Sequence, residues 1–247
     1  MTSDPKNYQP APGFLKDRII LVTGAGDGIG AAAARSFASY GATVVLTGRT
    51  KAKLEAVYDA IVEAGDPQPA IFVIDFAKAQ GDDYQNLYEG VEKEFGRLDG
   101  LLNNASILGN LSPIKNYDVA LWLEVMHVNL NAPFILTQTL LPLLEKSADA
   151  SVIFTSSGVG RTGRALWGAY AVSKFGLEGL SQIVADEHDN IRVNALNPGR
   201  TRTAMRKLAY PGEDPTTLPT PNDILPAFLY LIGPDSAGVS GESLECQ

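Results

Sequence analysis

The sequence predicts an α/β fold in which helices cover both faces of a doubly wound parallel sheet of seven strands. Short runs rich in β-branched residues alternate with longer helical stretches along nearly the whole chain, a pattern typical of βαβ units. Most of the candidate strands are almost continuously apolar, as strands are when both faces of their sheet are covered. The length of 247 residues suits one large domain better than two ordinary ones.

The elements follow one another in a regular order. Seven runs, of which the first is RIILVTG, predict strands at 18–24, 42–48, 70–76, 98–104, 150–156, 190–196 and 242–246. The stretches between them predict helices near 28–40, 51–64, 83–95, 117–146, 168–188 and 221–232. Where a helix joins two parallel strands of one sheet, the crossover is expected to be right-handed.

Two segments fall outside this alternation. Residues 1–15 are polar and proline-rich, so we expect an N-terminal arm ahead of a single domain over 16–247. Residues 206–221 are again rich in proline and polar residues, which predicts a long loop. Loops of this length in compact domains are often functional, and we expect this one to border the substrate.

Composition argues against several classes of protein. The formal net charge is −8, whereas a nucleic-acid-binding surface is basic. The one cysteine, Cys246, allows no internal disulfide and so gives no sign of secretion. The N-terminus lacks the pattern of a signal peptide, and no uninterrupted apolar run approaches the roughly 18 residues of a membrane span. We therefore expect a cytoplasmic protein that binds neither nucleic acid nor membrane.

A glycine loop follows the first strand directly. In TGAGDGIG, Gly24, Gly28 and Gly30 stand where the strand turns into a helix. Glycine lets the backbone, including that of Ile29, approach a phosphate closely, and the helix start offers free N–H groups to that anion. A tight strand–helix turn without a ligand is the alternative. The position between the first two strands favours nucleotide binding, and with it a single-domain Rossmann fold.

The end of the second strand indicates which nucleotide binds. Proteins that bind NAD usually carry Asp or Glu there, whereas those that bind NADP carry a basic residue for the 2′-phosphate. The sequence here is LTGRT, in which Arg49 can bind a phosphate through charge-assisted hydrogen bonds. We therefore predict NADP(H), with NAD(H) as the less favoured alternative. Asp27 in the glycine loop opposes this assignment, and Arg49 as an ordinary solvated arginine is the other interpretation.

Several further motifs follow in a fixed order. They are NNAS (103–106), HVNLNAPF (127–134), FTSSGVG (154–160), YAVSK (170–174) and NPGRTRT (197–203). Together with TGAGDGIG (23–30), they resemble the short-chain dehydrogenase/reductase family over roughly 15–246, with Ser106 in place of the usual glycine. Within that family, the sequence is most similar to the bacterial YciK-like oxidoreductases.

The resemblance implies a catalytic set of Asn129, Ser157, Tyr170 and Lys174. Residues four apart on a helix, such as Tyr170 and Lys174, lie on one face. A free tyrosine has a pKa of about 10, and a neighbouring ammonium lowers that pKa, so Tyr170 would act as acid in reduction and as base in oxidation. In the family the matching lysine also binds the nicotinamide ribose. A helix that merely happens to carry both residues is the alternative.

The other two members of the set have competing interpretations. Ser157 lies 13 residues before Tyr170, the usual separation in the family, and would orient the substrate oxygen. Its neighbour Ser156 would point to the opposite face of the strand. Asn129 would hold a water that links Lys174 to solvent, and an asparagine that bonds the backbone locally is the alternative.

Position predicts the remaining cofactor contacts. All lie at or after the carboxyl ends of strands, where open α/β sheets bind ligands. They are Asp75 for the adenine amino group, Asn103 and Ala105 for the ribose, and Pro198, Gly199, Thr201 and Thr203 for the nicotinamide and its carboxamide.

Other notable residues receive structural interpretations first. His127 and His188 are isolated, so we predict no metal site. Trp167 is expected to pack rather than to reach the substrate. Gly176 and Gly179 would each cost about 1 kcal/mol within a helix, which suggests a close approach of another helix, such as one across a subunit contact.

The basic residues near the site do not decide which class of substrate binds. Arg202, Arg206 and Lys207 would favour an acidic or acyl-carrier-borne substrate, although a solvated basic loop explains them better. Arg161 and Arg164 have the same two interpretations.

The predicted function is NADP(H)-dependent transfer of hydride between the nicotinamide and a small-molecule carbonyl or alcohol substrate. An NAD(H)-dependent dehydrogenase of the same family and a non-catalytic nucleotide-binding sensor or scaffold are the alternatives. Family members are often oligomers through two long helices, here 117–146 and 168–188, so the resemblance also implies a homodimer or homotetramer.

Overall fold

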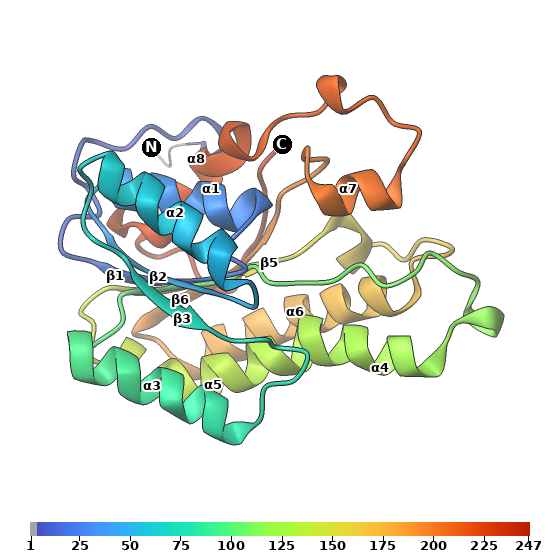
Figure 1. Cartoon of the computed structure of the whole chain (residues 1–247), viewed down its shortest axis with the longest axis horizontal. Helices are drawn as coiled ribbons and strands as arrows, with labels where there is room; N and C mark the ends of the chain where they lie inside the picture. The colour runs from blue at the N-terminus through green and yellow to red at the C-terminus, as the bar shows by residue number, and fades with distance from the viewer. Residues whose placement is uncertain (1–3) are drawn as a thin grey trace.

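Seven parallel strands form the central sheet of the computed structural model, which describes residues 4–247 (Figure 1). The strands are β1 (Ile19–Thr23), β2 (Thr43–Gly48), β3 (Ala70–Val73), β4 (Gly100–Asn103), β5 (Ala150–Thr155), β6 (Ile191–Asn197) and β7 (Ser243–Glu245). Their order in the sheet is β3-β2-β1-β4-β5-β6-β7. The order therefore reverses between β1 and β4, and this is the doubly wound Rossmann arrangement that the sequence predicts.

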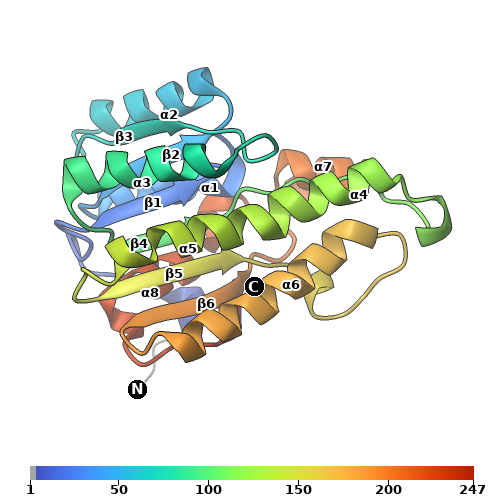
Figure 2. The same cartoon turned by 90° about the horizontal axis from the view of Figure 1, so that it is seen from below.

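Helices cover both faces of this sheet (Figures 1 and 2). One face carries α1 (Gly28–Ser39), α2 (Lys51–Glu63) and α8 (Leu225–Ile232). The other carries α3 (Gly81–Phe95), α5 (Ala132–Leu144) and α6 (Gly168–Glu187). Because apolar side chains are buried on both sides, the inner strands β1, β4 and β5 are buried along their whole length.

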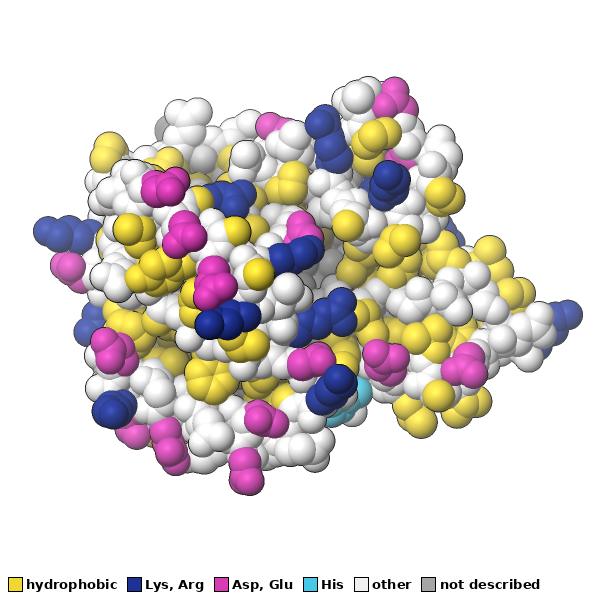
Figure 3. All heavy atoms as spheres, in the orientation of Figure 1, with side chains coloured by type: hydrophobic (Ala, Val, Ile, Leu, Met, Phe, Trp, Pro, Cys, Tyr) yellow, Lys and Arg dark blue, Asp and Glu magenta, His cyan; other side chains and the backbone are white. Residues whose placement is uncertain are grey.

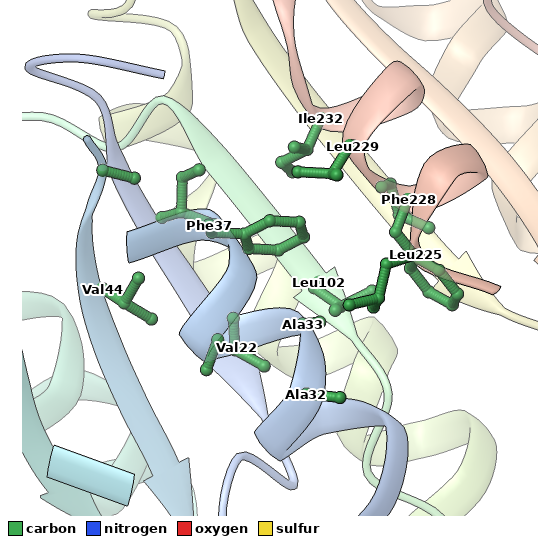
Figure 4. Close-up of a cluster of buried hydrophobic side chains, with 14 of the residues drawn as sticks. Val22, Ala32, Ala33, Phe37, Val44, Leu102, Leu225, Phe228, Leu229 and Ile232 are labelled. Atoms are coloured by element: carbon green, nitrogen blue, oxygen red, sulfur yellow. The ribbon is translucent and has the colours of Figure 1, made fainter. Parts of the chain in front are cut away.

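The core between α1, the sheet and α8 shows why α1 carries so many alanines. Figure 4 shows Phe37 of α1 directed towards Ile232 and Leu229 of α8, with Ala32 and Ala33 on the same helix. Phe37 and Ala33 are completely buried. Small side chains let α1 lie close to the strands, so that the glycine loop before it is fixed to the sheet edge.

The predicted helix 117–146 is confirmed as a helical segment over Val119–Leu144, but it contains an irregular turn that was not predicted. The segment consists of α4 (Val119–Met126), a π-helical turn (His127–Asn131) and α5. Pro133 stands at the start of α5, and since proline has no N–H, it cannot donate the helical hydrogen bond to the carbonyl of Asn129. The hydrophobic pattern does not reveal the π-helical turn, because such a turn adds only one residue to the helix.

The segment 117–146 also meets the length and composition of a membrane span. Within the 26-residue helix Val119–Leu144, the most apolar 18-residue window has a mean hydropathy of 1.4, and 33% of that window is buried. On the sheet side, Leu136, Leu140 and Leu143 are completely or almost completely buried. This is the packing of a core helix in an α/β domain, and core helices meet the same length and composition.

Two further elements differ from the predicted pattern. The expected loop 206–221 starts inside a helix, α7 (Ala204–Ala209), whose first turn is capped by the Thr203 hydroxyl accepting from Arg206 N. The expected helix 221–232 begins as a 3-10 turn (Pro221–Ile224) before α8. Short 3-10 turns also occur at Pro5–Asn7, Ile114–Asn116, Gly158–Gly160, Pro215–Thr217 and Pro234–Ser236.

The N-terminal segment lies against α8. The Tyr8 hydroxyl donates to Asp235 at 2.7 Å, and its ring lies edge-on to Tyr230 with the centroids 5.4 Å apart. Gly233 makes room for Phe14, since an added Cβ at Gly233 would lie 2.1 Å from that ring. Both aromatic side chains therefore anchor this segment to the domain.

Candidate active site

A cleft opens at the carboxyl edge of the sheet, where the strand order reverses. Its volume is ≈ 690 Å³, and segments that follow the first six strands line it. Figure 3 shows a hollow between the region of α1 and α2 and the region of α7, with Lys and Arg side chains around it. Doubly wound sheets bind ligands at this position, because the connections diverge there and leave a crevice.

The glycine loop forms one wall of the cleft. Gly24 has a φ of 65°, and an added Cβ at Gly30 would lie 2.3 Å from the Gly24 carbonyl oxygen. Neither position accepts a side chain without strain. The Thr23 hydroxyl accepts hydrogen bonds from the backbone N–H groups of Asn104 and Ala105, at 2.8 and 2.9 Å. The loop after β1 is thus joined to the loop after β4, and the N-terminus of α1 faces the cleft between them.

Asp27 does not present a free negative charge to this wall. Its carboxylate accepts from Gly28 N at 2.7 Å, which caps α1, and it forms an ion pair with Lys53 at 2.6 Å. The hydrogen bond from Lys53 is the main reason that the pKa of Asp27 lies below its usual value. The pair is neutral as a whole, so the objection that Asp27 raises against a phosphate is weakened.

Arg49 and Asp75 lie at the end of the cleft beside β2 and β3. Arg49 is exposed, and none of the ion pairs found among residues 4–247 involves it. Asp75 follows β3 by two residues instead of ending it, because β3 stops at Val73. Its Oδ1 accepts from Ala77 N at 3.2 Å, and its Oδ2 lies 4.0 Å from the exposed Lys78 Nζ.

Ser157, Tyr170 and Lys174 meet at the other end of the cleft. Ser157 follows β5, whereas Tyr170 and Lys174 lie one turn apart on α6. The Lys174 Nζ is 5.6 Å from the centre of the Tyr170 ring and donates to the Thr155 carbonyl at 2.7 Å. The turn that contains Gly160 lies close against α6 at Lys174, since an added Cβ at Gly160 would lie 2.8 Å from the Cβ of Lys174.

Burial controls the protonation of both groups on α6. It raises the pKa of Tyr170 to about 12, against a smaller lowering by the Ser157 hydroxyl. It lowers the pKa of Lys174 to about 7, against a raising by the Glu178 carboxylate. The lowering of the Tyr170 pKa expected from Lys174 is therefore not found in the protein alone, because loss of water around the phenol outweighs it. At neutral pH Tyr170 is a phenol, the form that donates a proton.

The two adjacent serines have different partners. Ser156 is buried and donates its hydroxyl hydrogen bond to Glu178 of α6. Ser157 is half-buried and lines the cleft beside Tyr170. The opposite directions of successive residues in an extended strand explain this division, and only the Ser157 hydroxyl is available to a ligand.

Asn129 is completely buried in the π-helical turn. Its Oδ1 accepts from Ile107 N at 2.8 Å, while its Nδ2 donates to the Ile107 carbonyl at 2.9 Å and to the Ser173 hydroxyl at 3.2 Å. The side chain thus joins the π-helical turn to α6 and to the loop after β4. Both of its N–H groups are used, so the amide has no donor left for a water.

Most of the predicted cofactor residues share the cleft. Those that line it are Gly24, Gly28, Ile29, Arg49, Asp75, Ala105, Tyr170, Lys174, Pro198, Gly199, Thr201 and Thr203. Gly30, Asn103 and Asn129 lie behind this surface. Asn103 is buried and donates to the Thr137 hydroxyl, and its neighbour Asn104, which the sequence did not single out, lines the cleft in its place.

The part of the cleft beyond Tyr170 has mostly apolar walls. They come from Leu108, Leu121, Val128, Trp167, Met205, Leu208 and Ala209, with Glu124 and Arg206 as the charged members. Trp167 packs on Tyr170 and Tyr210, with ring centroids 5.7 and 6.0 Å away. Trp167 therefore packs, as expected, and it is also part of this wall.

The basic residues near this wall are largely engaged. Arg206 binds Glu213 through two nitrogens, at 2.6 and 2.7 Å, and stacks on Tyr210. Arg161 binds Glu178 and Glu245. Arg164 is exposed and donates to the Tyr210 hydroxyl at 3.2 Å. The side chains of Arg202 and Lys207 face a separate groove on the other side of the glycine loop.

Histidines take no part in the cleft. His127 belongs to the π-helical turn, and His188 lies 3.6 Å from Glu145 at the end of α6. Among residues 4–247, no three His, Cys, Asp or Glu side chains gather in a way that could hold a metal ion.

Comparison with known proteins agrees with this architecture. A family model described as short chain dehydrogenase matches residues 18–214. The uncharacterized oxidoreductase YciK of Escherichia coli K12 is 50% identical over 242 residues, which cover 98% of this chain and 96% of that protein.

Two solved structures are similar over nearly their whole length. A short chain dehydrogenase from Shigella flexneri 2a, complexed with NADP, is 50% identical with a TM-score of 0.94 and covers 96% of this chain and 100% of that one. A short chain dehydrogenase from Escherichia coli CFT073, complexed with NADPH, is 51% identical with a TM-score of 0.95 and the same coverage.

Proposed function

The chain belongs to the short-chain dehydrogenase family of oxidoreductases, which act on CH–OH and C=O groups with NAD(P), and we propose that it uses NADP(H), with Tyr170 as the proton donor and acceptor. One observation carries the proposal. The glycine loop and the group of Ser157, Tyr170 and Lys174 line a single cleft. A dinucleotide held by the loop would bring its nicotinamide to the catalytic group.

The cleft fits a dinucleotide in three respects. The backbone at Gly24 and Gly30 leaves no room for a side chain, so phosphate oxygens can come close to it. The N-terminus of α1 stabilises negative charge there. At the other end, Thr155 lines the cleft, and its buried Oγ1 has no hydrogen-bond partner among residues 4–247, which fits a polar ligand beside it.

NADP(H) is the preferred form because of the charge around β2. Arg49 is exposed on the cleft wall, and Lys53 stands nearby in its pair with Asp27. Neither β2 nor the residue after it supplies a carboxylate for the ribose hydroxyls. The two relatives solved with NADP and NADPH support the same choice.

In the reducing direction, NADPH held in the cleft would supply the hydride for the carbonyl carbon of the substrate. The Ser157 hydroxyl donates a hydrogen bond to the carbonyl oxygen and orients it. Tyr170, a phenol at neutral pH, donates its proton to the alkoxide that develops. Lys174 in its ammonium form stabilises the tyrosinate that is left and binds the nicotinamide ribose.

The spent tyrosinate then needs a proton from solvent, and Asn129 has a place in this relay. Since the Asn129 amide is occupied by Ile107 and Ser173, a relay water would bind a backbone carbonyl. The Asn129 carbonyl is suited, because Pro133 supplies no N–H to it. The side chain then fixes the π-helical turn that presents this carbonyl.

The walls beyond Tyr170 favour a carbonyl compound with an apolar body. Trp167, Met205 and Leu208 offer apolar surface there, and Arg206 is neutralised by Glu213. A free carboxylate on the substrate would find no unpaired arginine next to Tyr170, so an acidic substrate is disfavoured.

The protein is proposed to be a homodimer, or a tetramer built from it, through α4, α5 and α6. On one face of the molecule, α4 and α5 follow one another along one line and α6 runs beside them (Figure 2). They expose large apolar side chains that a second copy would cover, namely Val119, Leu123, Phe134, Val172, Phe175 and Ile183. Gly176 is explained within the chain, since an added Cβ would lie 2.6 Å from Leu130, whereas Gly179 faces open space.

The decisive experiment follows NADPH oxidation with a panel of neutral ketones and aldehydes, for the wild type and Tyr170→Phe. We expect turnover by the wild type and a loss of at least about 100-fold in Tyr170→Phe, with unchanged binding of NADPH. Equal turnover by the two proteins would contradict the mechanism. NADPH binding without turnover of any substrate would instead favour the nucleotide sensor or scaffold.

A further inference from the structure

A buried carboxylate lies one helical turn beyond Lys174 and has no part in the mechanism above. Glu178 is on α6 and is 9% exposed. Because residues four apart share a helix face, its side chain is next to that of Lys174. A carboxylate in such a position is costly unless it is paired and hydrogen-bonded.

Three partners from different segments bind the Glu178 carboxylate. Ser156, at the end of β5, donates to Oε1, as does Arg161 Nε at 3.0 Å. Ser243 of β7 donates to Oε2. One side chain thus joins the helix that carries Tyr170 and Lys174 to the segment that carries Ser157 and to the last strand.

Arg161 extends these contacts to the other side of the cleft. Its Nη1 lies 2.5 Å from Glu245 Oε1, and its Nη2 donates to the Leu244 carbonyl at 2.8 Å. Glu245 Oε2 in turn accepts from Asn197 Nδ2 at 2.7 Å. Asn197 directly precedes Pro198, so the network reaches the segment expected beside the nicotinamide.

We propose that Glu178 is a positioning residue of the active site: with Arg161 it fixes the Ser157 segment against α6, and its negative charge holds Lys174 in the ammonium form. The inference rests on the proposed function, in which Lys174 acts as a cation beside Tyr170. It also explains the adjacent serines, because Ser156 serves Glu178 and leaves Ser157 to the substrate.

The charged and polar groups around Lys174 come from several elements. Its own helix supplies Tyr170 and Glu178, the segment after β5 supplies Arg161, and β7 supplies Glu245. From β5 comes the Thr155 carbonyl, and the π-helical turn contributes Asn129, which does not titrate. Burial brings the pKa of Lys174 to about 7 and Glu178 opposes that shift, so the lysine's charge at neutral pH depends on this carboxylate.

The test measures the titration of Lys174 directly, by NMR of protein labelled with ¹³C at the lysine Cε, and Lys174→Arg identifies its signal. Glu178→Gln keeps the shape and the serine contacts but removes the charge. We expect the Lys174 midpoint to fall by about one pH unit. Arg161→Gln removes the cation that competes with Lys174 for Glu178, so the midpoint is expected to rise.

Glu245→Gln is the matched control, because it removes a carboxylate on the far side of the same arginine. Its midpoint is expected to move by less than half as much as in Glu178→Gln. An unchanged midpoint in Glu178→Gln, or a fall in Arg161→Gln, would overturn the proposal. If Glu178→Gln does not fold, the direction of the shift in Arg161→Gln decides the question.

Kinetics provide the second readout. The pH above which carbonyl reduction declines is expected to fall in Glu178→Gln by the same interval as the Lys174 midpoint, while Glu178→Asp, which keeps the charge, restores it. The NMR titration needs no turnover. A wild type that reduces no carbonyl therefore counts against the proposed function alone, whereas turnover with an unshifted Lys174 in Glu178→Gln counts against this inference alone.

Discussion

Tyr170 and Lys174 show how strongly burial controls a proton-transfer pair. Tyr170 is 7% exposed and Lys174 is 2% exposed. Loss of water disfavours tyrosinate and ammonium alike, so the two pKa values move apart: that of Tyr170 rises to about 12 and that of Lys174 falls to about 7. The sequence predicts that these residues are neighbours, but it cannot supply this balance, because burial depends on every element around α6.

Arg49 carries the prediction of cofactor preference at the residue scale. Arg49→Ala is expected to weaken NADPH binding by about 10- to 100-fold, since a hydrogen bond to a charged group contributes roughly 1.5–3 kcal/mol. NADH, which has no 2′-phosphate, is expected to bind as before. Titration of each nucleotide by fluorescence measures both affinities.

The control for Arg49→Ala is Lys51→Ala. Lys51 is two residues away and pairs with Glu55 on the exposed face of α2, outside the cleft. The assignment to NADP(H) fails if both variants change NADPH binding equally, or if Arg49→Ala leaves the ratio of the two affinities intact.

At the scale of elements, the sequence predicts the sheet well and the irregular helices poorly. All seven strands coincide with the predicted runs to within two residues at each end, except that β3 ends three residues early, at Val73. An apolar run of five or six residues is a strong signal, whereas the π-helical turn at 127–131 leaves the hydrophobic pattern almost unchanged. Helix α7 is only six residues long and ends in the segment 206–221, whose prolines indicate a loop.

Two glycines within helices differ in the space that an added side chain would have. Gly30→Ala is expected to destabilise the protein and to abolish nucleotide binding, because the added Cβ would lie 2.3 Å from a backbone oxygen. Gly90→Ala on α3 meets nothing within 4 Å, and it is expected to raise the free energy of unfolding by about 0.5–1 kcal/mol, as alanine favours helix. Urea unfolding of both variants gives the comparison. Equal effects of the two substitutions would refute this account of the glycine loop.

At the scale of the whole molecule, the candidate site collects residues from Gly24 to Ala209. Those that belong to recognisable motifs could be predicted from the sequence. Glu178, Arg161 and Glu245 could not, because 17 and 84 residues separate Arg161 from its two carboxylate partners. The only local signal was an acidic residue on a helix face otherwise occupied by small and apolar side chains.

A group of ion pairs at the opposite edge of the sheet affects the stability of the fold in acid. Asp149 lies between Arg18 and Arg192, and its hydrogen bonds and ion pairs with them outweigh burial, so its pKa is lowered. A depressed carboxyl pKa stabilises the fold above the unfolded value of about 3.9, and this contribution is lost as the pH falls below it.

The free energy of unfolding is therefore expected to decline below about pH 4, and Asp149→Asn is expected to be less stable at neutral pH and to flatten that decline. Urea unfolding at several pH values tests this. A variant with the wild-type slope would show that other carboxylates cause the acid sensitivity.

The last prediction concerns the oligomeric state, which is expected to depend on the exposed apolar face of α4, α5 and α6. Phe175→Glu places a charge in the exposed apolar face of α4, α5 and α6, and it is expected to turn an oligomer into monomers. Val62→Glu is the control, since Val62 is equally exposed (45% against 44%) but lies on α2. Light scattering after gel filtration gives the mass of each. A monomeric wild type, or an oligomer unaffected by Phe175→Glu, excludes this interface.

The strand order also matters while the chain is being made. The register pairs Leu101 and Leu102 of β4 with Val152 and Ile153 of β5, which come about 50 residues later. At roughly 5–20 residues per second, a ribosome needs about 3–10 s to deliver that partner. Throughout this interval the emerging N-terminal half presents an apolar strand with an open edge, the kind of surface that aggregates or recruits a chaperone. Slow translation between these strands would therefore reduce the yield of native protein.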